Sequence, residues 1–191
     1  MTRQSDTGSL TRTELLRRAV ILCCSFTRNL AFCRVGQSDG GQPFLSASHP
    51  QAAFWRQANA NFLDIAVLDW CKLFGDKKAE HYWGQVVSDP VQFETGLLGH
   101  LGMDANAFQG EIDAMRRYRD KFVAHLDRLG VMDIPVLDAA QAAVQFYHGH
   151  IVEHEAAPAD LSGLPDTTGK LSLGYEQCVA EANAVFKAVR R

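Results

Sequence analysis

The residues best suited to chemistry lie in one charged run, Arg116–Arg128, inside an otherwise amphipathic segment. Guanidinium groups offer paired donors to phosphate oxygens, and imidazole exchanges a proton near neutral pH. Arg119 and His125 are therefore candidates to clamp a phosphate and to transfer a proton. Asp120 directly follows Arg119 and is a candidate to orient either residue. The local positive charge that a nucleic acid requires would come from Arg116, Arg117 and Lys121.

Helical periodicity predicts where these side chains lie. At about 100° per residue, five apolar residues share one helix face, and Arg119 and His125 fall on its two opposite edges, each about 60° from the centre. The five residues are Met115, Tyr118, Phe122, Leu126 and Leu129. We therefore expect Arg119 and His125 at the rim of a packed interface.

A second interpretation of the charged run needs no chemistry. Arg116 and Asp120 are four residues apart and share a face, as do Lys121 and His125. Solvated flanking charges with local ion pairs, and a histidine half-buried at a helix contact, would give the same pattern.

A histidine cluster near residue 150 is a candidate metal site. His150 and His154 are one helical turn apart, a spacing that can bind a transition metal if Glu153 or a residue of another helix completes the ligand set. Surface histidines explain the pattern equally well, and we expect no metal or other cofactor. The sequence contains no HExxH, no glycine-rich phosphate loop and no GxSxG.

Composition limits the class of protein. The chain has 191 residues, of which 47% are hydrophobic and 21% charged, so it can form one domain with a sizeable core. We expect a flexible N-terminus over residues 1–10 and a single helical domain over 11–191. The net charge of −3 leaves no global basic field, so any binding of nucleic acid must be local.

The cysteines and the apolar runs predict the compartment. The five cysteines are odd in number and form no CxxC pair, and the N-terminus has no apolar stretch of signal-peptide type. No run approaches eighteen consecutive apolar residues, so no membrane span is expected. The prediction is a reduced, cytoplasmic protein.

The elements that must position the charged run are helices. Apolar spacings and stop signals predict long helices over 11–34, from Ser48 and Pro50 to Gly75, over 104–130, from Pro135 to about Glu155, and over 174–189. They also predict a short helix or turn over 78–87 and a short helix over 89–98. Asp89 and Asp104 are expected N-caps. The fold class is all-α, a bundle of four to five main helices plus short helices.

Two segments carry a resemblance to a known family. YRDKFVAHLD, with Arg119 and His125 on one helix, resembles the Arg…His motif of the HEPN superfamily, and LDWCKLFGDKKAEHYWGQVVSD resembles its abortive-infection U-type branch. The resemblance covers most of residues 62–127. It implies a HEPN-like helical bundle that forms a homodimer and brings two Arg…His motifs into one cleft.

In active members this resemblance implies a metal-independent endoribonuclease in stress or phage defence, with RNA as substrate and a protein antitoxin as a further partner. The ribose 2′-hydroxyl attacks the adjacent phosphate, Arg119 holds the phosphate and His125 acts as general acid or base. Relatives that lack activity imply the alternative, a non-catalytic helical module that binds a protein partner, a nucleotide or RNA.

The same region contains an acidic residue in an apolar setting. Asp69 lies in IAVLDWCKLF and needs a partner if it is buried; Arg119 and Arg116 are the candidates. Tryptophans 70 and 83 and Tyr82 are expected to fill the core. Cys71 is expected to be a small buried residue, because nothing in the sequence supplies it with a base.

Overall fold

The computed structural model describes residues 10–124, 134–164 and 170–190, with only the backbone of residues 122–124, and in these ranges every regular element is helical. The elements in order are α1 Arg12–Gln37, α2 Gln42–Leu45, α3 Ala52–Trp70, the π-helical turn η1 Cys71–Gly75, α4 Trp83–Val86, α5 Pro90–Leu101, α6 Ala105–Tyr118, the π-helical turn η2 Arg119–Ala124, α7 Asp138–His150, the π-helical turn η3 Ile151–Glu155, and α8 Leu171–Val189. The all-α prediction is confirmed.

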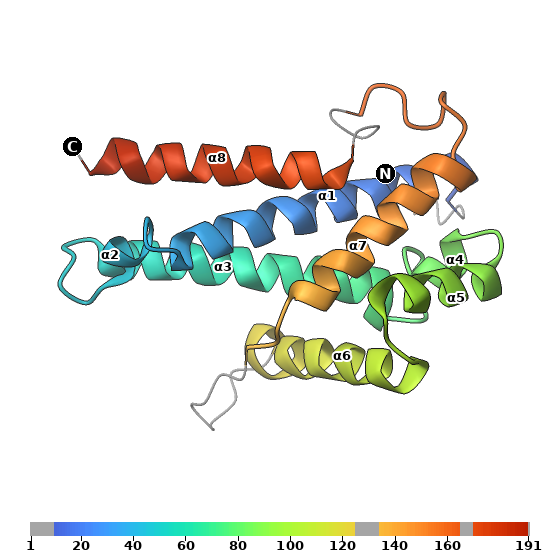
Figure 1. Cartoon of the computed structure of the whole chain (residues 1–191), viewed down its shortest axis with the longest axis horizontal. Helices are drawn as coiled ribbons and strands as arrows, with labels where there is room; N and C mark the ends of the chain where they lie inside the picture. The colour runs from blue at the N-terminus through green and yellow to red at the C-terminus, as the bar shows by residue number, and fades with distance from the viewer. Residues whose placement is uncertain (1–9, 125–133, 165–169, 191) are drawn as a thin grey trace, which may run out of the picture.

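Helix α1 is the centre of the fold. It packs against α3, α7 and α8, and α3 runs antiparallel to α1 while α8 runs in the same direction as α1 (Figure 1). Helix α7 crosses this layer at one end, and α6 lies along the opposite side of α3. The residues of α1 that face its neighbours, among them Leu16, Phe26 and Leu30, are completely buried.

An aromatic cluster joins the other helices to this layer. Trp70 stacks on Phe74 at 5.1 Å between ring centroids, and Phe74 meets Tyr147 of α7 edge-on at 5.8 Å. Trp83 stacks on Phe93 of α5 at 5.0 Å. The prediction that Trp70 and Trp83 fill the core is therefore confirmed, whereas Tyr82, also expected there, is only half-buried.

Helices α5 and α6 begin at the N-caps that the sequence predicts. Asp89 accepts the Gln92 N–H at 2.9 Å and Asp104 accepts the Ala107 N–H at 2.8 Å, as predicted. The predicted start of α3 at Ser48 is wrong. Residues 46–52 form hydrogen-bonded turns instead, and the helix begins at Ala52.

The expected helix over 104–130 also needs correction. The described part of the segment after Asp104 is not one continuous α-helix, because η2 replaces α-helical geometry from Arg119 to Ala124. The remainder of the predicted helix, residues 125–130, lies outside the described residues. The last helix is confirmed, although it begins at Leu171 and not at residue 174, and several of its apolar residues are exposed: Val185 is 51% exposed and Val189 45% exposed. Helix α8 packs mainly on α1 and is an outer helix, so one narrow stripe suffices.

Helix α1 is long and apolar enough to cross a membrane by length and composition, and 56% of its most apolar window is buried inside the bundle. The core helix of a soluble protein meets the same criterion. The position of α1 at the centre of the bundle accounts for its composition.

A close backbone approach makes Gly41 the most constrained glycine of the α1–α2 loop. A β-carbon at this position would overlap the carbonyl oxygens of Val35 and Gly36. Gly41→Ala is therefore expected to destabilise the protein by about 2 kcal/mol, as overpacking does. Urea denaturation measures the effect. Gly110→Ala in α6, where a β-carbon meets nothing within 4 Å, is the control and should be neutral or stabilising; equal losses for both variants would contradict the steric argument.

Candidate functional site

Arg119 lies at the centre of the charged run and is held by two carboxylates. Its Nη1 donates to both oxygens of Asp76, each at 2.7 Å, and its Nε donates to Asp120 Oδ1 at 2.8 Å. The Arg119 side chain is only 17% exposed, so it lies at the rim of the packed interface, as its edge position predicted. The guanidinium therefore has one fixed orientation.

These contacts also determine the charge of Arg119. Burial acts to lower its pKa, but the hydrogen bonds to Asp76 and Asp120 outweigh burial, and the pKa lies above its already high ordinary value. Arg119 is thus charged at every pH of interest. Within the described residues its Nη2 makes no hydrogen bond, which leaves these N–H groups for a further acceptor.

Local structure explains why Asp76 meets Arg119. The turn η1 ends α3 at Gly75, and the Asp76 N–H donates to the Cys71 carbonyl at 2.9 Å, which fixes the exit of the chain. η1 packs against α6, where a β-carbon on Gly75 would lie 3.3 Å from Cγ of Arg116. The end of α3 and the end of α6 are therefore in direct contact.

The structure brings together some of the predicted site residues. Asp120, the candidate to orient either Arg119 or His125, contacts Arg119. Arg116 and Arg117 are exposed and Lys121 is half-buried. His125 lies outside the described residues, so the distance between Arg119 and His125 stays a prediction. Arg116 and Asp120, which share a helix face by their spacing, form no ion pair with each other within the described residues, and Asp120 binds Arg119.

The predicted partner of Asp69 is wrong. Asp69 is buried, and its Oδ1 accepts from Lys72 Nζ at 3.4 Å, whereas Arg119 binds Asp76. The other oxygen of Asp69 is buried and has no hydrogen-bond partner among the described residues. Asp76 is thus the functional candidate that sequence reasoning missed. Its place directly after the helix stop Phe74–Gly75 is the local signal that could have drawn attention to it.

Cys71 lies beside this cluster but is unsuited to nucleophilic chemistry. Burial raises the pKa of its thiol to about 12, and the charge of Arg119 reverses only part of that effect. The thiol is therefore protonated near neutral pH, which agrees with the expected structural role. All five cysteines of the chain are free.

The histidine cluster, which the sequence offered as a candidate metal site, is part of a hydrogen-bonded network. His150 Nε2 lies 3.2 Å from Glu155 Oε1, and His154 Nε2 lies 3.9 Å from Glu153. Glu155 also accepts from the backbone N–H and hydroxyl of Ser88 at 2.7 and 2.6 Å, and from Arg12. Within the described ranges no group of three potential ligands could hold a metal ion. This network joins η3, α1 and the start of α5.

The Glu155 network predicts a pH-dependent stability. Burial acts to raise the pKa of Glu155, but the hydrogen bonds from Ser88 and His150 and the charge of Arg12 lower it below the ordinary value. A carboxylate with a lowered folded-state pKa stabilises the protein above its unfolded pKa of about 4.3, and this contribution is lost as the pH falls through the folded pKa. Glu155→Gln is thus expected to reduce the unfolding free energy by about 2 kcal/mol at pH 7. Denaturation at pH 7 and pH 3 measures the difference, and a loss of equal size at both would contradict this account.

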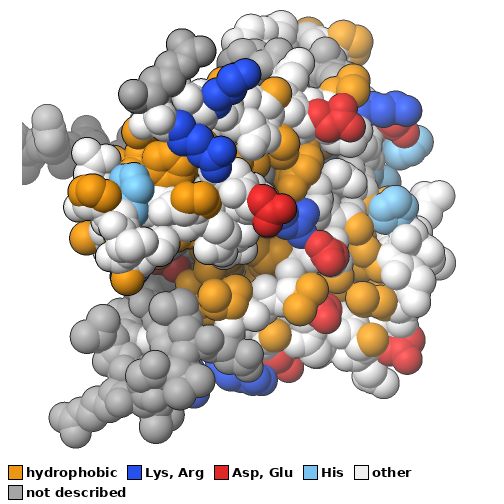
Figure 2. All heavy atoms as spheres, turned by 60° about the vertical axis from the view of Figure 1, so that its left-hand side comes forward, with side chains coloured by type: hydrophobic (Ala, Val, Ile, Leu, Met, Phe, Trp, Pro, Cys, Tyr) orange, Lys and Arg blue, Asp and Glu red, His pale blue; other side chains and the backbone are white. Residues whose placement is uncertain are grey.

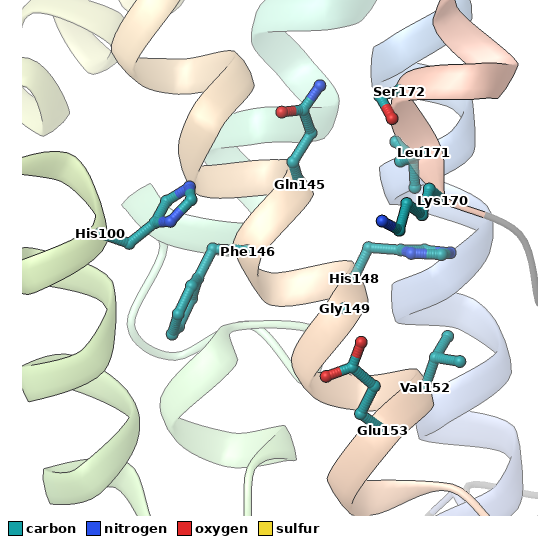
Figure 3. Close-up of a pocket in the computed structure, with 10 residues that line it drawn as sticks. All are labelled: His100, Gln145, Phe146, His148, Gly149, Val152, Glu153, Lys170, Leu171 and Ser172. Carbon is teal, nitrogen blue, oxygen red and sulfur yellow. The ribbon is translucent and has the colours of Figure 1, made fainter.

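Two of the hollows that lie away from Arg119 border α8. One, of about 250 Å³, is lined from α5, α7 and the start of α8. In Figure 3 His100 and Phe146 lie on one side of α7, while His148 and Lys170 lie toward α8. The other, of about 330 Å³, lies between α3 and α8 and is lined mainly by apolar side chains, among them Phe32, Phe54, Trp55, Phe62, Val185 and Phe186. Figure 2 shows hydrophobic side chains at the surface between charged groups on one end of the molecule.

Comparisons with protein-family models, with curated proteins and with solved structures found no significant match to this chain. The fold and the geometry at Arg119 are therefore the structural basis for a functional argument, together with the resemblance of the two sequence segments. Of the hollows and clusters described, only the Arg119 cluster combines a fixed cationic donor with exposed positive charge next to it.

Proposed function

We propose that this chain is a HEPN-like helical protein that cleaves RNA as a homodimer without a metal ion. The observation that carries the proposal is the Arg119 guanidinium, which Asp76 and Asp120 hold in one orientation at the rim of the bundle. An oriented guanidinium is what stabilisation of a phosphorane-like transition state requires, because the donors must already point at the developing charge. The all-α architecture is consistent with a HEPN-like bundle.

The proposed reaction uses side chains of the chain alone. The ribose 2′-hydroxyl loses its proton to a base, its oxygen attacks the adjacent phosphorus, and the bond to the 5′-oxygen breaks. The leaving oxygen takes up a proton, so the products are a 2′,3′-cyclic phosphate and a 5′-hydroxyl. Arg119 donates to the phosphate oxygens, and the His125 imidazoles of the two protomers exchange the protons near neutral pH.

A non-catalytic module is the second candidate, and one observation favours it. Arg119 already has two carboxylate partners, and a guanidinium whose charge is balanced attracts a phosphate less strongly. In this alternative the same helix end binds a protein partner, a nucleotide or RNA and no bond is cleaved. The two candidates differ in one measurable property, the appearance of RNA fragments.

Cleavage in the presence of a chelator tests the proposal. Purified protein and an end-labelled RNA are incubated with excess EDTA, and the expected result is cleavage at the rate seen without EDTA, with 2′,3′-cyclic phosphate ends. An arginine and a histidine need no metal-bound water. Cleavage that requires added Mg²⁺ or Mn²⁺ would refute the mechanism, and tight binding of RNA or a protein without any cleavage would establish the module instead.

A further inference from the structure

The segment after η1 is an ordered turn that presents two lysines. The Ala79 N–H donates to the Asp76 carbonyl at 2.7 Å, and this hydrogen bond closes a turn with Lys77 and Lys78 at its two central positions. The Tyr82 N–H donates in turn to the Ala79 carbonyl at 3.0 Å. Both lysines are exposed. The turn is therefore hydrogen-bonded on both sides of the lysines and directs them into solvent.

The turn is anchored to the candidate site by its first residue. Both carboxylate oxygens of Asp76 bind Arg119, and the backbone of Asp76 binds Cys71. The positions of Lys77 and Lys78 are consequently coupled to that of the arginine. On the neighbouring helix, the stem of Arg116 lies against Gly75, so the side chains of α6 border the same turn.

The charges around the turn are unevenly compensated. Within the described residues Lys77, Lys78, Arg116 and Arg117 form no ion pair. Most neighbouring acids are already engaged with other cations: Asp76 and Asp120 bind Arg119, Asp69 binds Lys72, and Glu80 faces Arg18 at 4.0 Å. Asp113, one turn before Arg116 and Arg117 on α6, accepts from Gln109 Nε2 at 3.0 Å and is one acid beside four cations. This corner therefore has uncompensated positive charge on a chain whose net charge is −3.

We infer that the turn Asp76–Ala79 is a phosphate-binding element for a single strand of RNA. Lys77 and Lys78, with Arg116 and Arg117, bind the phosphates that flank the one at Arg119. The inference rests on the proposed function for the claim that the ligand is RNA. The claim that these residues bind it rests on the geometry of the turn. Four cations on two elements suit a chain of phosphates better than a single nucleotide, because each neutralised phosphate releases counterions.

The chemistry of this surface also predicts how it selects its ligand. The nearby aromatic side chains Trp70, Phe74 and Trp83 are buried and offer no face for base stacking. Tyr82, which follows the turn, is half-buried, and its ring packs against Trp83 at 5.2 Å between centroids. Binding therefore depends on charge, with a strong salt dependence and little preference for base sequence.

A binding experiment that excludes cleavage tests the inference. A fluorescent twelve-nucleotide RNA with 2′-O-methyl groups lacks the attacking hydroxyl, so anisotropy reports binding alone. The Lys77→Gln/Lys78→Gln variant is compared with Arg28→Gln/Lys187→Gln, which removes the same charge from exposed positions on α1 and α8. Loss of two phosphate contacts is expected to reduce the slope of log K against log salt by about 1.4 and to weaken binding about 25-fold in 0.1 M salt. The control variant should keep the wild-type slope.

The outcomes distinguish a failure of the inference from a failure of the proposed function. Wild-type slope and affinity in the lysine variant, an equal loss in the control variant, or no binding by the wild type would overturn the inference. Tighter, lysine-dependent binding to phosphatidylserine vesicles than to RNA would also overturn it, since the surface would then bind a membrane. If the slope falls as expected but unmodified RNA is not cleaved, the phosphate-binding turn stands and the proposed ribonuclease function fails.

Discussion

Arg119→Ala is expected to lower RNA cleavage by at least about 10²-fold, the usual effect of removing one preorganised donor from a developing oxyanion. His125→Ala is expected to have an effect of similar size, because it removes the group that transfers the protons. Initial rates on an end-labelled RNA measure both. Neither residue belongs to the apolar stripe, and the carboxylates that Arg119 leaves behind, Asp76 and Asp120, are 37% and 57% exposed and can be solvated. The melting temperature should therefore change little.

Arg119→Lys is the matched control for the arginine. It keeps the positive charge but has no planar set of donors with which to bind Asp76 and a phosphate at once. Affinity for RNA should survive better in this variant than the rate of cleavage does. Wild-type rates in Arg119→Ala or in His125→Ala would show that the chemistry assigned to these residues is wrong.

Much of the fold could be predicted from the sequence because the signals were local. The caps at Asp89 and Asp104 need only a side-chain oxygen and an N–H three residues later, and both form as expected. The stop at Phe74–Gly75 and the left-handed Gly102 after α5, with a φ of 63°, are likewise determined by neighbouring residues. Such features depend little on how the helices pack.

The central contact of the site could not be predicted in the same way. Asp76 and Arg119 are 43 residues apart, and they meet only because η1 packs on α6. The sequence offered Asp69 as the acid near Arg119, since a carboxylate in an apolar run needs a partner. The π-helical turns η1 and η2 rotate the side chains at the ends of α3 and α6 away from their α-helical positions. A helical wheel with a constant period cannot predict that rotation.

The burial of the last helix likewise could not be predicted from its sequence. Its apolar residues recur at helical spacing, which shows which face is apolar but not whether a partner covers it. Only Leu171 and Ala182 of α8 are buried, because α8 lies on α1 at the outside of the layer. The number of neighbours of a helix is a property of the whole fold.

Tyr118→Ala is expected to give the largest loss of stability among variants of the charged run. Tyr118 immediately precedes Arg119 but points inward: it is 3% exposed, and its hydroxyl donates to Asp64 Oδ1 of α3 at 2.9 Å. Burial and the hydrogen bond to Asp64 both raise its pKa, as expected for a phenol that stays neutral inside the bundle. Removing a buried ring costs about 3–5 kcal/mol, which lowers the melting temperature of a chain of this size by about 10 °C.

Tyr118→Phe keeps the ring and loses only the hydrogen bond, for about 1 kcal/mol. Arg117→Ala, its exposed neighbour, should stay within about 0.5 kcal/mol of the wild type. Urea denaturation followed by circular dichroism separates the three variants, and a loss in Tyr118→Ala no larger than that in Arg117→Ala would mean that α6 is not packed on α3 through this residue.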